Sequence, residues 1–206
     1  MKDIRSRLGD IYFLINNAGI SHRSPFINTD NSVIEKIMQV NFFGAVYCTK
    51  AALADIIKQK GMIITVSSFA GIAPLIARSG YSASKHALHG FFESLRTELT
   101  DSGVKIMMVN PVFITTNIGK NSIDGTGKSA AQKRYIIGSE SSPDYIAKII
   151  LKSAIKGKRF VIPTIQGKFY YLIRRLFPSL YDRLMINKLH GEMVSNRFMN
   201  NETSND

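Results

Sequence analysis

Cysteine is nearly absent from this chain of 206 residues, which contains only Cys48. A single thiol excludes an internal disulfide and a cysteine cluster that could hold a metal ion. Residues 1–7 lack an apolar core and do not form a secretory signal peptide. No run of about 18 apolar residues is present either, so the sequence predicts no transmembrane helix. We therefore expect a cytoplasmic protein without a bound metal.

Acidic residues are also scarce, with 15 against 27 basic residues and a net charge of +12. Residues 120–206 carry 15 basic and 7 acidic side chains and hold most of the excess. No recognition motif accompanies this charge, so we do not expect nucleic acid as a partner. An anionic membrane surface or a phosphorylated cofactor fits the charge as well. The apolar content of 45% is ordinary for one globular domain.

Strand-like and helix-like segments alternate along the chain. Short apolar runs predict strands, and apolar residues at helical spacing predict helices. The predicted strands are 11–15, 62–66, 104–109 and 159–163, and the predicted helices are 31–58, 81–99 and 143–156. This alternation is typical of an α/β fold with a parallel sheet.

Small polar segments follow three of the predicted strands. Asn16-Asn17-Ala18-Gly19 follows the first, Ser67 and Ser68 follow the second, and residues 110–117 follow the third. In open parallel sheets, ligands bind at the carboxyl ends of the strands. A simple turn is the alternative for the first segment, because Asn and Gly favour turns without any function.

Tyr81 and Lys85 lie four residues apart and therefore share one face of the predicted helix. A nearby ammonium favours ionised tyrosine and lowers the phenol pKa from its usual value of about 10. Such a phenol can exchange a proton with a carbonyl oxygen near neutral pH. Ser68 can offer a hydroxyl to the same oxygen. The alternative is a tyrosine at the edge of the core beside a solvated lysine.

Asn41 and Gly44 interrupt the middle of the helix predicted over 31–58. Both residue types are poor helix formers. They indicate a kink, or a site that needs the amide. A solvent-facing Asn41 is the ordinary alternative.

Two features that resemble ligand sites have simpler explanations. Residues 125–129, Gly-Thr-Gly-Lys-Ser, match the end of a phosphate-binding loop, but Ser122 replaces its first glycine and no strand leads into it. The surrounding stretch, 118–141, is rich in Gly, Ser and Lys and indicates a mobile loop. His86 and His89 have no acidic or cysteine partner at ligand spacing, so we interpret them as surface or packing histidines.

Residues 168–190 form a basic, aromatic-rich amphipathic segment that is interrupted at Pro178. One interpretation is a pair of helices packed on the body or on a second subunit. The other is a surface that contacts a membrane or covers an apolar substrate. The polar residues after Asn196 are predicted to be disordered.

Taken together, residues 8–165 resemble the short-chain dehydrogenases/reductases in their short single-domain branch. The resemblance depends on Asn16-Asn17-Ala18-Gly19, the mid-helix Asn41, Ser68 and the Tyr81-x-x-x-Lys85 pair in this order, with a partial match over Pro111 to Thr116. It implies a Rossmann-like, doubly wound parallel sheet. It also implies an NAD(P)-dependent oxidoreductase that interconverts a carbonyl and an alcohol.

The resemblance assigns roles to individual residues. Tyr81 would be the proton donor or acceptor, Lys85 would lower its pKa and hold the nicotinamide ribose, and Ser68 would bond the substrate oxygen. Asn41 would keep a water in a proton relay. The remaining assignments are to the cofactor, NAD or NADP: Asn17, Ala18 and Gly19 beside its adenosine half, and Pro111, Ile114 and Thr116 beside its nicotinamide.

Two departures from the family pattern stand out. Val112 replaces the glycine that usually follows the proline, and a β-branched residue there restricts the backbone and crowds the nicotinamide side. The Gly-rich turn that receives the pyrophosphate does not precede Asn16. We therefore expect residues 1–165 to be the C-terminal portion of a truncated Rossmann domain that binds cofactor poorly and exposes apolar surface. Residues 166–195 would then form a basic helical segment and 196–206 a polar tail.

Residues 79–92 resemble family members that act on steroid, retinoid or other lipid carbonyls. This similarity implies an apolar small-molecule substrate, and complete family members form homodimers or homotetramers. Two alternatives to an enzyme stay open. One is a non-catalytic remnant that serves subunit association, and the other is a peripheral membrane module built on 168–190.

Overall fold

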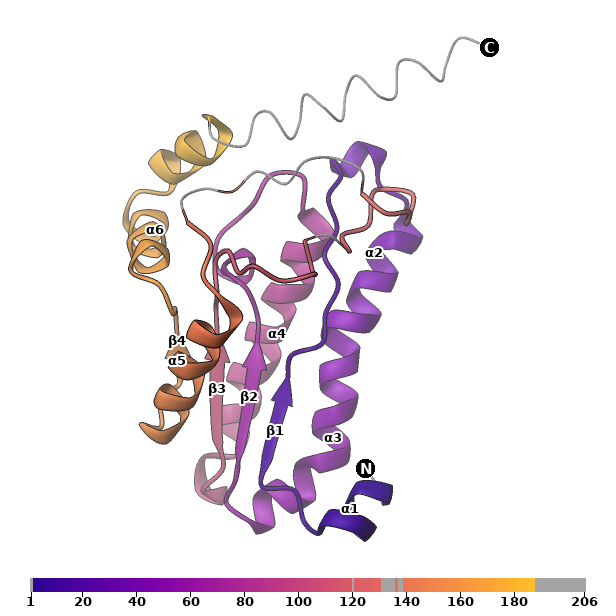
Figure 1. The fold of residues 1–206 in the computed structure, drawn as a ribbon, viewed down its shortest axis with the longest axis vertical. Helices are drawn as coiled ribbons and strands as arrows, with labels where there is room; N and C mark the ends of the chain where they lie inside the picture. Colours follow the sequence, from indigo (N-terminus) through magenta and orange to yellow (C-terminus); the bar gives the residue numbers. More distant parts are fainter. Residues whose placement is uncertain (1, 120, 131–135, 137–138, 188–206) are drawn as a thin grey trace.

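A four-stranded parallel sheet forms the centre of the protein in the computed structural model, which describes residues 2–119, 121–130, 136 and 139–187 (Figure 1). The strand order is β1-β2-β3-β4. Phe13 lies opposite Met62, and Met62 lies opposite Lys105. The strands are β1 (Phe13–Asn16), β2 (Met62–Val66), β3 (Lys105–Val109) and β4 (Phe160–Val161). The predicted parallel α/β sheet is confirmed, with strand ends that differ from the prediction by a few residues.

Helices cover both faces of this sheet (Figure 1). The α2 helix (Asn31–Met38), the π-helical turn η2 (Gln39–Phe43) and α3 (Gly44–Lys58) run together, and with α4 (Ser79–Glu98) they cover one face. Side chains alternate along β2, so Ile63 faces the core formed with α3 and α4. Its neighbours Met62 and Ile64 face α5 (Pro143–Ile155) on the other side.

The continuous helix over Asn31–Lys58 is long and apolar enough, by length and composition, to cross a membrane. The sequence predicted no such helix, because Asn41, Gly44 and several charges divide its apolar residues. In the structure this helix contributes Ile37 and Ile56, both fully buried, to the protein core. A core helix passes the same test of length and composition.

Local signals in the sequence fix the ends of the helices. The Ser142 side chain accepts a hydrogen bond from the Tyr145 amide at 3.2 Å, and Pro143 is the first helical residue of α5. At the other end Gly157 adopts a left-handed φ of 61°. The α6 helix (Ile165–Leu176) ends before Phe177, and a second helix begins at Pro178 and covers 178–187. These predicted boundaries are confirmed.

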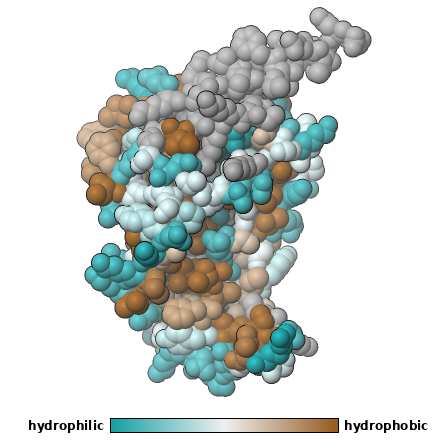
Figure 2. Space-filling model, in the orientation of Figure 1, coloured by the Kyte–Doolittle hydropathy of each residue, from teal (hydrophilic) through white to brown (hydrophobic). Residues whose placement is uncertain are grey.

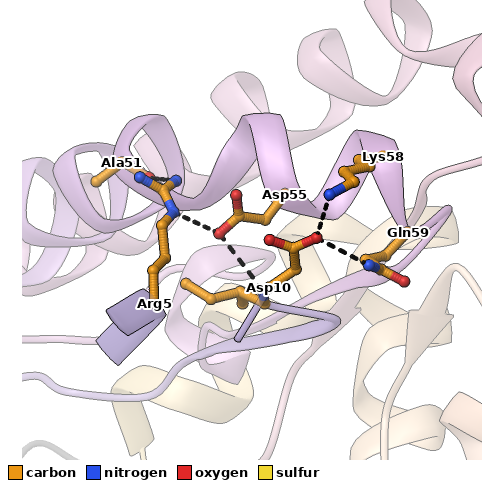
Figure 3. Close-up of polar contacts among 7 residues, drawn as sticks. Arg5, Asp10, Ala51, Asp55, Lys58 and Gln59 are labelled. Carbon is orange, nitrogen blue, oxygen red and sulfur yellow. Dashed lines mark hydrogen bonds and ion pairs between the residues drawn. The ribbon is translucent and has the colours of Figure 1, made fainter. Parts of the chain in front are cut away.

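A polar cluster ties the segment before β1 to the end of α3 (Figure 3). Arg5 Nε lies 2.6 Å from Asp55 Oδ2, and the same oxygen accepts from the Ile11 amide at 3.4 Å. One turn later, Lys58 Nζ lies 2.6 Å from Asp10 Oδ2. These contacts hold α1 (Lys2–Leu8) against α3 and set where the chain enters β1.

One edge of the sheet carries exposed apolar side chains. No strand pairs with the outer edge of β1 within the described part of the chain. Phe13 and Ile15 on this strand are 53% and 57% exposed. Figure 2 shows apolar side chains over the front of the sheet. The expected exposure of apolar sheet surface is therefore present.

Replacement of Gly61 by alanine tests how tightly the turn before β2 packs against the chain that enters β1. A Cβ at this position would clash with the carbonyl oxygen of Tyr12, a backbone atom that cannot move aside easily. We expect Gly61→Ala to lower the free energy of unfolding by about 1–3 kcal/mol through overpacking. Urea denaturation measures the change. Gly90→Ala is the matched control, because nothing lies within 4 Å of its Cβ, and it should stabilise α4 slightly. Equal effects of the two substitutions would contradict this packing.

Candidate functional site

A cavity of about 360 Å³ opens at the carboxyl ends of β1, β2 and β3. Every predicted site residue except Asn41 lies on its wall. These residues are Asn17, Ala18, Gly19, Ser68, Tyr81, Lys85, Pro111, Ile114 and Thr116. The structure therefore brings together segments that are separated by up to about half of the chain.

Tyr81 and Lys85 lie on the first two turns of α4, and both are almost fully buried. Lys85 Nζ is 5.8 Å from the centre of the Tyr81 ring and donates a hydrogen bond of 3.0 Å to the Val66 carbonyl. Burial lowers the pKa of Lys85 to about 8. The ammonium is therefore mostly protonated at neutral pH, and a cation this close favours ionisation of the phenol.

Ser68 follows β2 and caps the short helix η3 (Phe69–Gly71). Its Oγ accepts a hydrogen bond of 3.2 Å from the Ala70 amide. This bond orients the hydroxyl, whose hydrogen can be donated to a carbonyl oxygen in the cavity. The neighbouring Ser67 donates to the Lys85 carbonyl at 3.2 Å and joins the end of β2 to α4.

Asn41 lies behind the cavity wall and is only 1% exposed. Its Oδ1 accepts from the Ile20 amide at 2.8 Å, while its Nδ2 donates to the Ile20 carbonyl and to Ser84 Oγ, both at 3.0 Å. The π-helical turn is closed by a bond from the Gly44 amide to the Gln39 carbonyl. The prediction of a site that needs the amide is therefore confirmed, and the solvent-facing alternative is wrong.

Gly19 allows the loop after β1 to approach the helices closely. A Cβ on this residue would lie 3.1 Å from Asn41 Oδ1 and 3.6 Å from Lys85 Nζ. The first distance is tighter than ordinary van der Waals contact. The small residue at the end of Asn-Asn-Ala-Gly is thus needed for packing as well as for a turn.

Val112, the departure from the family pattern, packs toward α6. Its Cγ2 lies 2.6 Å from the position that a Cβ on Gly167 would occupy. The only described non-glycine residues with positive φ are Lys60 and Ala77, so Val112 fits its backbone conformation without strain there. The Val112 side chain lines the cavity, and its predicted crowding of the nicotinamide side stays a prediction.

The loop that resembles a phosphate-binding loop uses its amides internally. Asp124 Oδ1 accepts from the amides of Thr126 and Lys128 at 2.9 and 3.0 Å. Gly125 lies directly against the Asn28 carbonyl. Amides engaged in this way do not form a phosphate cradle, which agrees with the simpler interpretation of the sequence.

The predicted packing role of His89 matches its surroundings. His89 is buried, with Nε2 2.7 Å from Asn110 Oδ1, and burial lowers its pKa. His86 is exposed, with Nδ1 2.9 Å from the Ser82 carbonyl. Within the described ranges, no group of three or more His, Cys, Asp or Glu side chains is placed to hold a metal ion.

Two charged residues on the cavity wall, Arg23 and Arg78, were not predicted from the sequence. Both are buried, as is Ser122 beside Arg23. Arg23 follows Gly19 by four residues and Arg78 precedes Tyr81 by three. This closeness in sequence to Gly19 and Tyr81 was the one available sign that the arginines lie at the site. A single arginine in a loop is, however, usually a solvated surface charge.

The buried charge of Lys85 should make folding stability depend on pH. The unfolded chain keeps the ordinary lysine pKa of 10.5 and holds more protons than the folded chain between pH 8 and 10.5. Stability therefore rises with pH across this window, by about 3 kcal/mol from this group. At neutral pH the folded chain lacks this stabilisation, because the Lys85 ammonium is charged and removed from water.

Replacement of Lys85 by methionine tests the free-energy cost of burying this ammonium. We expect Lys85→Met to be more stable than the parent by about 1–2 kcal/mol near neutral pH, because the desolvation cost exceeds the loss of one hydrogen bond to Val66. The gain should disappear or reverse by about pH 10.5. Urea denaturation of both proteins at the two pH values measures the difference. Lys50→Met, at an exposed site on α3, is the control, and a gain that is independent of pH would argue against a buried ammonium.

Comparison with known proteins supports the resemblance found in the sequence. Residues 1–126 match the short chain dehydrogenase family. The chain is 37% identical over 177 residues to the Dehydrogenase/reductase SDR family protein 7-like of Drosophila melanogaster, a match that covers 85% of this chain and 54% of the fly protein. It is 35% identical over 198 residues to Dehydrogenase/reductase SDR family member 7B of Mus musculus, a match that covers 94% of this chain and 60% of the mouse protein. The chain thus spans less than two thirds of these relatives.

Solved structures show the same fold. A short chain dehydrogenase from Burkholderia cenocepacia in complex with NADP superposes with a TM-score of 0.75 at 23% identity, over 89% of this chain and 72% of that one. A short chain dehydrogenase/reductase from Burkholderia phymatum in complex with NAD gives a TM-score of 0.74 at 15% identity, over 87% of this chain and 70% of that one. These similarities establish a partial Rossmann-like fold.

Proposed function

Because the chain belongs to the short chain dehydrogenase family, we propose that it takes part in NAD(P)-dependent interconversion of a carbonyl and an alcohol. The observation that carries this proposal is the convergence of Ser68, Tyr81 and Lys85 on one cavity with the segments 17–19 and 111–116. An interaction module has no need of such a set, so this convergence favours an enzyme over a non-catalytic remnant.

The cavity residues fit the nicotinamide end of a dinucleotide. A volume of about 360 Å³ is at the lower end of the range for small-molecule sites. Asn17, Ala18 and Gly19 would border the cofactor on one side, and Pro111, Ile114 and Thr116 would flank the nicotinamide. The cofactor supplies the hydride. The choice between NAD and NADP stays open, since solved structures of this fold contain either one.

In carbonyl reduction, Tyr81 would donate its proton to the substrate oxygen as that oxygen gains negative charge. The hydroxyl of Ser68 would hold the same oxygen and fix the direction of the carbonyl. Lys85 would stabilise the resulting phenolate, because its ammonium lies close to the Tyr81 ring. In alcohol oxidation the same groups act in reverse, with the phenolate as base.

In this scheme the Asn41 side chain would position neighbouring segments of the chain. Among the described residues, its side chain bonds to Ile20 and Ser84, so a relay water would be held by backbone groups near it. The side chain itself would fix the loop after β1 against α4. This differs from a role in which the Asn41 amide binds the water directly.

An apolar recess of about 30 Å³ beside the cavity supports a lipid-like or other apolar substrate, of which only a small group would fit there. It shares Ser68, Leu75, Val112 and Phe113 with the cavity and continues to Phe69, Tyr170 and Met185. Tyr170 belongs to α6 and Met185 to the helix that follows it. A small apolar group attached to the carbonyl would therefore contact α6 and the helix that follows it.

Replacement of Tyr81 by phenylalanine tests the catalytic proposal. Removal of the hydroxyl should lower the rate of NAD(P)H oxidation with ketones by about 100-fold or more, because the proton donor is lost. Thermal unfolding should be nearly unchanged, since the ring still fills its site. Tyr47→Phe, on an exposed face of α3, is the matched control. Turnover by Tyr81→Phe at the rate of the parent chain would refute the proposal.

We further propose that α6 contacts an anionic membrane surface. Ile165, Phe169, Leu172 and Leu176 lie on one face of this helix at spacings of three and four residues, and all are more than half exposed. Lys168 and Arg175 are exposed on the same helix. An apolar stripe beside basic residues is typical of helices that lie in the plane of a membrane interface.

Sedimentation with vesicles tests the membrane proposal. The chain should pellet with vesicles that contain phosphatidylserine, pellet less with neutral vesicles, and lose binding as salt is raised. The double substitution Phe169→Glu and Leu172→Glu should abolish binding. Leu151→Glu, on α5 and 63% exposed, is the control for added charge. Equal binding by the two variants would show that α6 does not make the contact.

A further inference from the structure

Tyr181 connects the C-terminal part of the protein to the chain between two of the proposed catalytic groups. It lies on the helix that follows α6 and is fully buried. Its hydroxyl donates a hydrogen bond of 3.1 Å to the Pro74 carbonyl, 107 residues earlier in the chain. Its ring packs beside Phe69, with the two ring centres 6.4 Å apart, and Phe69 directly follows Ser68. Tyr181 therefore contacts the chain between Ser68 and Tyr81 at two points.

The loop over 72–78 needs contacts of this kind because its backbone is strained. Ala77 has a φ of 54°, in the left-handed region that a residue with a Cβ rarely adopts. The Ser24 amide holds the turn by donating a hydrogen bond of 3.0 Å to the Ala77 carbonyl. The Tyr181 hydroxyl holds it at Pro74, three residues earlier. A strained conformation persists only where its surroundings fix it, and these two contacts from outside the loop contribute to that.

The same loop determines how the proposed catalytic groups lie relative to each other. It begins just after η3, whose cap is Ser68, and it leads into α4, which carries Tyr81 on its first turn. Within the loop, Leu75 lines both the cavity and the apolar recess. A shift of the loop would therefore move Ser68 and Tyr81 relative to each other, although one substrate oxygen must reach both.

Tyr181 itself does not face the cavity. It is not among the described residues that line the cavity or the apolar recess. Burial raises the pKa of its phenol above the ordinary value of 10, so the hydroxyl keeps its proton and remains a donor to Pro74 at physiological pH. Any effect of Tyr181 on a reaction in the cavity must therefore pass through the loop.

We propose that Tyr181 is a positioning residue, which fixes the loop over 72–78 so that Ser68 and Tyr81 face one substrate oxygen. This inference rests on the proposed carbonyl–alcohol chemistry. Without the hydroxyl, the Pro74 carbonyl loses a buried donor, and the strained turn loses one of its two outside contacts. Small displacements of reacting groups lower rates strongly, so the contact bears on catalysis although it lies outside the cavity.

Replacement of Tyr181 by phenylalanine removes the hydroxyl and keeps the ring. We expect kcat for ketone reduction with NAD(P)H to fall at least about 5-fold. The KM for the ketone should change by less than about 2-fold, because the loss concerns reaction geometry rather than uniform binding. Tyr145→Phe, on α5 and 51% exposed, is the matched control and should leave both constants unchanged. Assays well below the midpoint of thermal unfolding of each variant, measured by circular dichroism, keep unfolded protein out of the comparison.

Hydrogen exchange followed by mass spectrometry provides a readout that needs neither cofactor nor substrate. In Tyr181→Phe, amides of the loop over 72–78 should exchange at least about 5-fold faster than in the parent chain, because the loop opens more often. Amides of β2 and β3 should exchange as before. Tyr145→Phe should leave exchange in the loop unchanged.

Replacement of Ala77 by glycine separates positioning from general stability. Glycine adopts a φ of 54° without strain, so the loop then depends less on contacts from outside. Ala77→Gly added to Tyr181→Phe should restore part of kcat and slow exchange in the loop. If Tyr181 only stabilised the packing of its own helix, a change in the loop would restore neither, and that result would overturn the inference.

The outcomes distinguish this inference from the proposed reaction. Exchange and kcat that are both unchanged in Tyr181→Phe would overturn the inference. Faster exchange in the loop with an unchanged kcat would also overturn it, since the loop would then move without consequence for a reaction that still stands. If exchange in the loop depends on Tyr181 while Tyr81→Phe reduces ketones at the parent rate, the fixing of the loop by Tyr181 is supported and only the catalytic proposal fails.

Discussion

A single buried amide holds the functional end of this fold together. Asn41 uses both ends of its side chain, to the backbone of Ile20 and to Ser84 on α4. The π-helical turn at Gln39–Phe43 adds one residue to the helix at the position where the amide must point inward. A polar group this deeply buried is stable only because its donors and acceptor are satisfied. Loss of the Asn41 amide would remove the partner of both the N–H and the C=O of Ile20.

The same compact arrangement determines the electrostatics of the site. Gly19 lets the loop after β1 lie against Asn41 and Lys85, and this closeness removes water from the lysine. Desolvation lowers the Lys85 pKa while its charge stays near Tyr81. The fold thus holds a cation at a position where it opposes stability near neutral pH. Such a conflict between stability and local chemistry is common at functional sites.

Sequence patterns predicted much of this architecture, because the signals involved are local. Apolar runs located the strands, Ser142 and Pro143 located the start of α5, and four-residue spacing placed Tyr81 and Lys85 on one helix. The inward position of Asn41 was one of the alternatives that its poor helix propensity left open, and local signals could not select it because its partner Ile20 is 21 residues away. The buried arginines were missed because loops remote in sequence create their surroundings.

The C-terminal helix α6 shows why a departure from a motif is best judged with its neighbours. Val112 replaces a small residue on the cavity wall, and α6 supplies Gly167 at the point of contact. The inner side of α6 then contributes Tyr170 to the apolar recess, while Phe169 on its outer side stays exposed. One helix therefore borders both the apolar recess and the proposed membrane surface.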